Sequence, residues 1–320
     1  MLEPRRRGYN GGAERGEGQK AADTVREVTR EEYQEFLRTH KEVLIEGKAV
    51  KLVTGGKIAL LEPPEFKLEK TTVWSFENRG KWATHRGNYR GNWAPEIPRN
   101  LILRYTQPGE TVLDQMVGSG TALVECKLLG RNGIGVDINF EALMVAWNRL
   151  DFAYSEEATV QRLYHGDARN LDLIPDESVD LVATHPPYAN IIPYSKSTEN
   201  GDLSRVHSIT EFVDEIGKVA EESYRVLKPG KHCGILIGDT HKHKHYVPIA
   251  FRVMEAFLEQ GFILREDVIK KQWHTQTMRG RWRESRDHDF LLTFHEHLFI
   301  FRKLSLEEKT SMFKDSMRWW

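Results

Sequence analysis

From residue 107 onward, short apolar runs that suit strands alternate with segments whose apolar residues recur at helical spacing. The runs that we expect to form strands are 112–114, 133–137, 160–165, 179–184, 233–237, 262–270 and 297–301. The segments that we expect to form helices are 121–129, 141–150, 210–227 and 251–260. Repeated strand–helix units predict an α/β fold, with a mostly parallel sheet covered by helices on both faces. A polar loop, 271–290, separates the last two strands, which suit an antiparallel edge.

The sequence divides into four expected segments. They are a disordered tail (1–28), a small αββ appendage (29–65), the α/β domain (66–303) and a C-terminal helix (304–320). The tail is rich in Gly, Arg and Glu and has too few large apolar groups to order itself. In the appendage we expect a helix capped by Thr29, then strands at 43–53 and 57–61 joined by a turn at 54–56. Ser305 is expected to cap the final helix.

Composition excludes several classes of protein. With 39% hydrophobic and 29% charged residues, the chain is typical of a soluble globular protein. It has no apolar run near the ~20 residues of a membrane span, so we expect no membrane partner and a cytoplasmic location. The two cysteines, Cys126 and Cys233, fit a reducing compartment and form no metal-ligand pattern, and we expect no metal. The net charge of −1 means that nucleic acid would need a local basic patch.

Aspartates stand at the ends of three successive expected strands. Asp114 ends the first and Asp137 the second, while Asp167 follows the third. Asp137 lies about twenty residues beyond a glycine turn, the spacing at which an acid binds ribose hydroxyls. An acid after the third strand could accept a hydrogen bond from an adenine amino group. These positions indicate a nucleotide-like ligand at one edge of the sheet.

The glycine turn lies between the first strand and its helix. Gly118 and Gly120 can adopt positive φ and let a ligand approach the main chain, and Thr121 begins the helix. The turn has neither the G-x-G-x-x-G dinucleotide spacing nor the lysine of a phosphate-binding P-loop. Glycines and acids also occur at strand ends in α/β proteins without such a site, which is the alternative interpretation.

The segment Thr184-His185-Pro186-Pro187-Tyr188 follows the fourth strand. Consecutive prolines fix φ, so the Pro186 carbonyl is held rigidly enough to accept a hydrogen bond from an amino group. The Tyr188 ring could stack on an unstacked base. A neutral His185 could accept one amino hydrogen, whereas a protonated one could not. The alternative is that the prolines only form a tight turn.

Together, in this order, these motifs resemble the S-adenosylmethionine-dependent amino-methyltransferases that act on cytosine N4 or adenine N6. The resemblance covers about residues 70–303 and implies the class I methyltransferase fold, a Rossmann-like doubly wound sheet. It implies catalytic roles for His185, Pro186, Pro187 and Tyr188, and cofactor binding by Asn100, Asp114, Gly118, Gly120, Thr121, Asp137 and Asp167. That family usually has Asp, Asn or Ser at the position of His185, so this chain departs from the pattern there.

Two polar loops are candidates for contact with nucleic acid. The candidate residues in them are Lys196, Arg205, Arg279, Arg281, Trp282 and Arg283. Basic groups interleaved with aromatic rings suit a phosphate backbone and unstacked bases. A similar basic and aromatic cluster occupies 79–93. Ordinary surface loops are the alternative for each.

The sequence therefore predicts an S-adenosylmethionine-dependent enzyme that methylates an exocyclic amine in nucleic acid, with cytosine N4 in DNA as the first candidate and adenine N6 as the next. Three alternatives stay open. The substrate could be RNA, ribosomal RNA in particular. A similar Pro-Pro-Tyr motif serves methylation of a protein glutamine amide. A non-catalytic nucleic-acid-binding module could also keep this fold.

Overall fold

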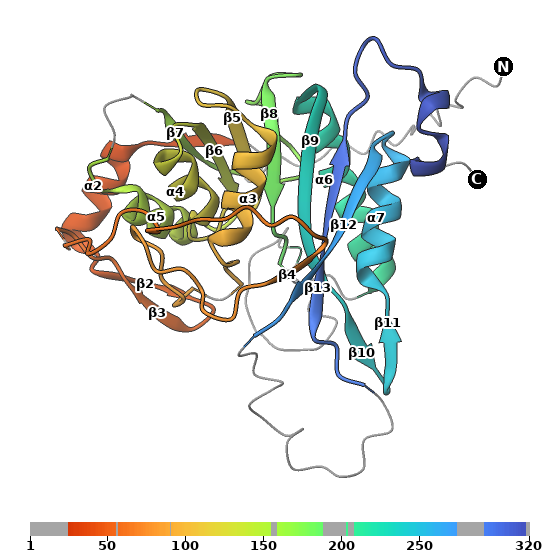
Figure 1. Cartoon of the computed structure of the whole chain (residues 1–320). Helices are drawn as coiled ribbons and strands as arrows, with labels where there is room; N and C mark the ends of the chain where they lie inside the picture. The colour runs from red at the N-terminus through yellow and green to blue at the C-terminus, as the bar shows by residue number, and fades with distance from the viewer. Residues whose placement is uncertain are drawn as a thin grey trace, which may run out of the picture.

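The computed structural model describes residues 25–55, 57–89, 91–154, 159–187, 203, 208–273 and 291–317. A mixed sheet runs through the described part of the chain (Figure 1). Its strands are β1 (Arg26–Val28), β4 (Val73–Ser75), β5 (Thr111–Asp114), β6 (Asn132–Asp137), β7 (Gln161–His165), β8 (Val179–Thr184), β9 (Leu227–Gly238), β12 (Ile263–Lys271) and β13 (His295–Arg302). They follow the order β1-β7-β6-β5-β8-β9-β13-β12-β4.

The strand directions confirm the predicted fold class. From β7 to β9 every neighbouring pair is parallel, whereas β13 is antiparallel to both β9 and β12. The two late strands thus form the expected antiparallel pair. The short β4 lies outside β12 and parallel to it, so the pair itself is not the edge. This order is that of a Rossmann-like doubly wound sheet with one reversed strand.

Helices cover both faces of the sheet (Figure 1). They are α2 (Arg30–Thr39), α3 (Glu96–Tyr105), α4 (Thr121–Leu128), α5 (Phe140–Leu150), α6 (Ile209–Val226) and α7 (Ile249–Glu259). Successive strand residues point to opposite faces, so Val112 packs with the core beneath α3, α4 and α5, while Leu113 packs with the core beneath α6 and α7. Within the described residues, none of the helices combines the length and the apolar character that crossing a bilayer requires.

The chain changes direction across the sheet at β5. From β5 it proceeds through β6 to β7 on one side, and later through β8 to β9 on the other. In open α/β sheets, ligands bind outside the carboxyl ends of the strands at this kind of switch point. The fold therefore places the candidate site at the carboxyl ends of β5, β6 and β8.

The amino-terminal expectations need two corrections. Residues 26–28 belong to β1, which pairs with β7, so the predicted tail extends too far; Val28 is fully buried. In the appendage, Thr29 caps α2 as expected, and Glu32 N donates to Thr29 Oγ1 over 3.2 Å. The hairpin that follows turns earlier than predicted.

That hairpin pairs β2 (Glu42–Ile45) with β3 (Lys48–Lys51). Glu46 and Gly47 form its turn with φ of 47° and 75°, a two-residue left-handed turn that matches strand twist. Residues 57–61 form no strand, so the Gly-Gly pair at 55 and 56 was wrongly interpreted as the hairpin turn.

The predicted C-terminal helix is also wrong over the described residues. Two 3₁₀ helices, η2 (Thr310–Met312) and η3 (Lys314–Ser316), stand in its place. Ser305 N does donate to Glu308 Oε2 over 3.0 Å, yet that carboxylate also pairs with Arg302. Leu306 is 89% exposed. A helix is stabilised mainly by burying an apolar face, and residues 304–317 bury no apolar side chain.

Candidate active site

Hydrogen bonds join the carboxyl ends of four neighbouring strands. Thr184 Oγ1, on β8, donates to Asp114 Oδ1, on β5, over 3.2 Å. Gly118 N, in the turn after β5, donates to Asp137 Oδ2, on β6, over 2.8 Å. Gly166 N, after β7, donates to the Asp137 carbonyl over 3.0 Å. The structure thus brings together the ends of β8, β5, β6 and β7, the edge of the sheet at which the sequence predicts a ligand site.

The glycine turn adopts the conformation that its sequence favours. Gly118 has φ of 48°, and Gly120, which caps α4, has φ of 78°. A Cβ on Gly120 would lie 3.1 Å from Ala146 Cβ, so this glycine also lets α4 and α5 approach closely. A Cβ on Gly118 would lie 3.1 Å from a ring carbon of Tyr89. Thr121 is buried as the first residue of α4.

Asp137 is half-buried and held by two backbone donors. Besides Gly118 N, Asn139 N donates to its Oδ1 over 2.9 Å. Each carboxylate oxygen has two lone-pair positions, so the acid keeps capacity for further donors such as hydroxyl groups. This geometry suits the expected contact with a ribose diol.

Asp114 is a buried acid with few protein partners. It is 2% exposed and accepts hydrogen bonds from Met116 N and Thr184 Oγ1, each over 3.2 Å. Burial raises the pKa of its carboxyl to about 7. An ammonium group beside it would favour the ionised form, which fits the expected place of the methionine moiety.

The Asp167 carboxylate has hydrogen-bond and ion-pair partners within the protein that the sequence does not indicate. Its Oδ1 accepts from Arg169 N and from Arg169 Nε, each over 2.9 Å. The Arg169 guanidinium also pairs with Glu215 on α6. The ion pair fixes the carboxylate at the edge of the site, but it takes up most of its acceptor positions.

Asn100 is held by hydrogen bonds inside the protein. It is fully buried in α3, where its Nδ2 donates to the Glu96 carbonyl over 2.9 Å. Its Oδ1 accepts from Glu69 N, also over 2.9 Å. Because both ends of the amide are used, Asn100 fastens residue 69 to α3. Its expected contact with the cofactor stays a prediction.

His185 is enclosed where β8 ends. Its ring stacks on Trp93, with centroids 5.9 Å apart and planes 28° apart. Burial lowers the pKa of the His185 imidazole to about 4, against the smaller opposing influence of Glu296. Glu296 pairs with Lys270, with Nζ and Oε2 2.7 Å apart. The imidazole is therefore neutral at physiological pH.

The remaining predicted site residues divide between described and undescribed positions. Pro186 is buried and Pro187 is exposed beyond it. The others lie outside the described residues: Tyr188, Lys196, Arg205, Arg279, Arg281, Trp282 and Arg283.

The tryptophans and His85 of the cluster at 79–93 are interior, whereas Lys81 and Arg86 are exposed, so a contact with nucleic acid there stays a prediction for the basic residues alone. Trp82, His85 and Trp93 are each 5–6% exposed. Trp82 Nε1 and His85 Nε2 contact Glu125 Oε1 on α4 at 2.7 and 2.6 Å. The sequence could not separate the two roles, because aromatic side chains serve either a core or a base-stacking surface.

That cluster nevertheless supplies residues to the site. Tyr89 lies against Gly118, and the backbone of Gly91 forms a hydrogen bond with His185. Trp93 stacks on His185. The Lys270–Glu296 pair was also missed, since nothing in the local sequence pattern joins β12 and β13 to β8. For Trp93, the available signal was its place in the basic and aromatic cluster at 79–93.

The groups at the strand ends fit S-adenosylmethionine. A buried acid faces the position of an ammonium, a half-buried acid can accept from a diol, and a left-handed glycine turn exposes main chain between them. Asp114, Gly118 and Asp137 would hold those parts of the cofactor.

Curated proteins share parts of this chain. It is 35% identical over 85 residues to the type II methyltransferase M.HpaI of Haemophilus parainfluenzae, covering 27% of each chain. It is 34% identical over 181 residues to the tRNA (guanine(10)-N2)-dimethyltransferase of Methanothermobacter thermautotrophicus, covering 56% of this chain and 45% of that one. The chain thus spans between about a quarter and a half of the length of these curated relatives.

Solved structures overlap with the chain more loosely. A S-adenosylmethionine-dependent methyltransferase from Methanosarcina mazei has a TM-score of 0.44 and 16% identity, covering 64% of this chain and 97% of that one. A putative DNA modification methylase from Thermus thermophilus, complexed with S-adenosylmethionine, has a TM-score of 0.31 and 26% identity, covering 45% of this chain and 56% of that one.

A profile of the DNA methylase family matches residues 17–147 and 179–315. The two matched stretches include the glycine turn, Asp137 and the Thr-His-Pro-Pro segment described above. They cover well over half of the chain. The chain therefore belongs to the N6/N4 DNA methylase family, which uses S-adenosylmethionine as its cofactor.

Proposed function

We propose that this protein transfers a methyl group from S-adenosylmethionine to the exocyclic amino group of a base in nucleic acid, with cytosine N4 in DNA as the first candidate. One observation carries the proposal. A neutral, half-buried His185, whose Nδ1 atom is enclosed, leads into two prolines at the end of β8, and Thr184 beside it donates to Asp114 on β5. An acceptor for an amino group thus lies next to the expected methionine end of the cofactor.

The reaction needs acceptors because an exocyclic amine is a poor nucleophile. Its lone pair is delocalised into the ring, and hydrogen bonds from its N–H groups help to localise that pair on nitrogen. The Pro186 carbonyl and an imidazole nitrogen of His185 are the acceptors that we assign. When bound, S-adenosylmethionine supplies an electrophilic methyl group. The amine nitrogen forms the new N–C bond as the C–S bond breaks, and one N–H proton is released.

The environment of His185 decides which role it takes. An imidazole whose pKa is about 4 accepts a hydrogen bond but does not store a proton at neutral pH. We therefore assign His185 to orientation of the amine, and solvent accepts the released proton. Neutrality has a second benefit, since an imidazolium would repel the positive sulfonium. The nearby Lys270 is compensated by Glu296, which limits the positive charge at this position.

A second candidate substrate is RNA. The tRNA methyltransferase relative shares 34% identity with 181 residues of this chain and is named for guanine N2, which is also an exocyclic amine. The same acceptors would serve that nitrogen. We place DNA first because the family profile is that of DNA methylases.

The test is nucleoside analysis after reaction with labelled cofactor. DNA and tRNA are each incubated with the protein and methyl-labelled S-adenosylmethionine, digested, and analysed by mass spectrometry. N4-methylcytosine from DNA supports the first candidate, and N6-methyladenine keeps the enzyme class with the other DNA base. N2-methylguanine from tRNA supports the second candidate. Label in protein alone, or no transfer by a protein that binds the cofactor, would overturn the proposal.

Two variants test whether labelling depends on the proposed cofactor site. At low cofactor concentration Asp137→Ala should strongly reduce labelling by weakening cofactor binding, whereas exposed Asp172→Ala should leave labelling unchanged. Labelling that survived Asp137→Ala at low cofactor concentration would indicate that the label enters at another site.

A further inference from the structure

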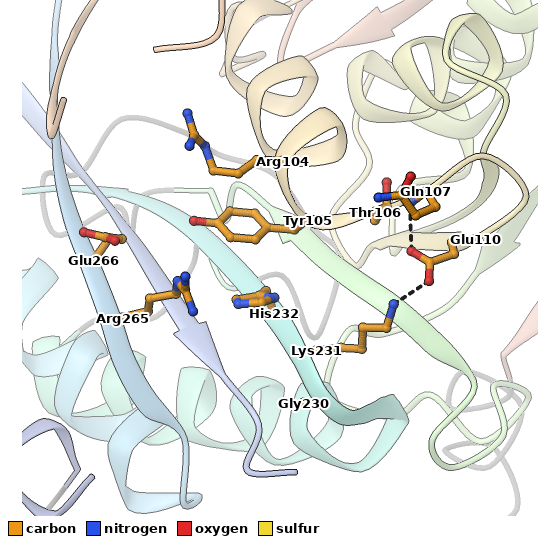
Figure 2. Close-up of a pocket in the computed structure, with 10 residues that line it drawn as sticks. All are labelled: Arg104, Tyr105, Thr106, Gln107, Glu110, Gly230, Lys231, His232, Arg265 and Glu266. Carbon is orange, nitrogen blue, oxygen red and sulfur yellow. Dashed lines mark hydrogen bonds and ion pairs between the residues drawn. The ribbon is translucent and has the colours of Figure 1, made fainter. Parts of the chain in front are cut away.

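A pocket of about 480 Å³ lies beside the end of α3 (Figure 2). Arg104 and Tyr105 reach it from the end of α3, His232 from the middle of β9, and Arg265 from β12. In the antiparallel register of β9 and β13, His232 lies opposite Arg302, the last residue of β13. The pocket is therefore at the amino end of the parallel strands, whereas His185 is at their carboxyl end. The pocket is therefore separate from the proposed methyl-transfer site.

An irregularity in β12 directs two successive side chains into this pocket. The register passes from Leu264 opposite Phe301 to Glu266 opposite Ile300, so Arg265 is an extra residue. Neighbouring residues in a regular strand point to opposite faces, but Arg265 and Glu266 both line the pocket. β-Bulges commonly redirect a side chain in this way beside functional sites.

The pocket carries excess positive charge. Lys231 is compensated, since it pairs with Glu110 and lies 3.3 Å from Asp180. By contrast, among the residues that the structure describes, neither Arg104 nor Arg265 forms an ion pair with a carboxylate. Figure 2 shows both guanidinium groups beside the Tyr105 ring, with the Glu266 carboxylate as the remaining acid. Two guanidinium groups and one carboxylate leave a net charge of about +1.

His232 provides a polar group that lacks a partner in the described chain. Its ring stacks on Tyr105, with centroids 4.3 Å apart and planes 29° apart. Both ring nitrogens are buried, and within the described residues neither has a hydrogen-bond partner. Burial, followed by the charges of Arg265, Arg302 and Lys231, lowers the pKa of His232 to about 4. The neutral ring keeps one N–H donor, and a buried donor without a partner is costly.

We propose that this pocket binds a small phosphate-bearing molecule, no larger than a mononucleotide, through Arg104 and Arg265, with the His232 ring in the wall beside it. The planar guanidinium fork matches phosphate oxygens in two-point hydrogen bonds. A phosphate monoester carries about −1.5 to −2 charges at pH 7, which suits a net positive site. The volume of about 480 Å³ falls within the range of small-molecule sites.

The experiment measures pyrophosphate binding to the full chain by calorimetry. Saturating S-adenosylhomocysteine is present, so that the probe cannot enter the cofactor site. Arg104→Gln and Arg265→Gln should each weaken binding by roughly 10-fold or more, because each removes charge-assisted hydrogen bonds. The matched control is Arg252→Gln, an exposed arginine on α7, which should bind as the wild type does.

A second readout needs no variant. In the wild-type protein, pyrophosphate should shift the ring resonances of His232 and leave those of His185 unchanged. Binding that survives both arginine substitutions, or no shift at His232, would overturn the proposal. So would competition by a short oligonucleotide without terminal phosphates, because it would assign the pocket to a nucleic-acid backbone. None of these outcomes depends on methyl transfer, so the two proposals fail separately.

Discussion

Thr184 Oγ1 donates to Asp114 Oδ1 across 3.2 Å, and both groups are buried. The bond joins the strand that leads into the Thr-His-Pro-Pro segment to the strand that leads into the glycine turn. A displacement of either strand end is thereby transmitted to the other. The acceptor side and the cofactor side of the proposed reaction share this one carboxyl group.

Asp114 should make cofactor affinity depend on pH. Burial raises the pKa of its carboxyl to about 7, and an ammonium favours the ionised form. Affinity should therefore rise as pH increases through about 7 and fall below it. Calorimetry with S-adenosylhomocysteine between pH 5.5 and 8.5 measures this, and Asp114→Asn should flatten the profile. The same dependence in both proteins would assign the titration to another group.

Asp137→Ala should weaken binding of S-adenosylmethionine by roughly 10- to 150-fold, as expected for the loss of ~1.5–3 kcal/mol of charge-assisted hydrogen bonding. The variant also removes the acceptor for Gly118 N and Asn139 N, so the turn itself loosens. Calorimetry on the folded variant gives the affinity, with exposed Asp172→Ala as control. Unchanged affinity would remove Asp137 from the site.

His185 should stay neutral down to about pH 4. At saturating cofactor, which removes the dependence of binding on Asp114, single-turnover methyl transfer should therefore show no acid limb near 6.5, the ordinary histidine value, and decline only toward pH 4. The folded-state pKa lies below the unfolded one, so the unfolded chain binds this proton more tightly. The stability that neutral His185 retains above pH 6.5 is lost as pH falls toward 4.

Two measurements check this prediction. An NMR titration of the His185 ring gives its pKa directly, and His185→Asn should keep some activity while removing the loss of stability between pH 6.5 and 4. An NMR midpoint near 6.5 would mean that Trp93 and its surroundings do not exclude water from the ring.

Glu125→Gln should destabilise the fold by roughly 3–5 kcal/mol, the cost of breaking a buried ion pair. Glu125 is fully buried and accepts from Trp82 Nε1 and from Arg99 Nη1, over 2.7 and 2.8 Å. Denaturant unfolding measures the change. Glu32→Gln, at a 36% exposed acid paired with Arg26, should cost under about 1 kcal/mol. Equal losses in the two variants would contradict a special role for the buried cluster.

Charge reversal at Arg281 and Arg283 tests the proposed nucleic-acid contact. If these groups neutralise phosphates, the double variant should bind DNA or RNA more weakly and with a shallower dependence on salt. Cofactor affinity should not change. Binding at several salt concentrations measures the slope, and an unaltered slope would exclude this loop as a backbone contact.

Much of the α/β core could be predicted, because each strand and helix there has its own local signal. The strand ends at Asp114 and Asp137 followed from those signals, and the site followed from the strand ends. The two outermost strands of the sheet have no such local signal. β1 and β4 have three residues each and form only by pairing with β7 and β12, which lie far away in the sequence.

The identity of His185 was readable, but its protonation state was not. Its neutral form depends on burial against Trp93, a residue ninety-two positions earlier. The interior role of Trp82 was hidden for the same reason, since its partner is Glu125. A glutamate among the apolar residues 122–126 of the helix was the available sign of a buried polar cluster.

The position of β13 has a consequence for synthesis of the chain. Residues 295–302 fill the gap between β9 and β12, so during translation that gap stays open until this segment has left the ribosome. Until then β9 presents a row of unpaired N–H and C=O groups, the kind of edge on which foreign strands assemble. A nascent chain stalled before residue 295 should therefore aggregate or recruit chaperones, even though the strands that carry the glycine turn and Asp137 are already complete.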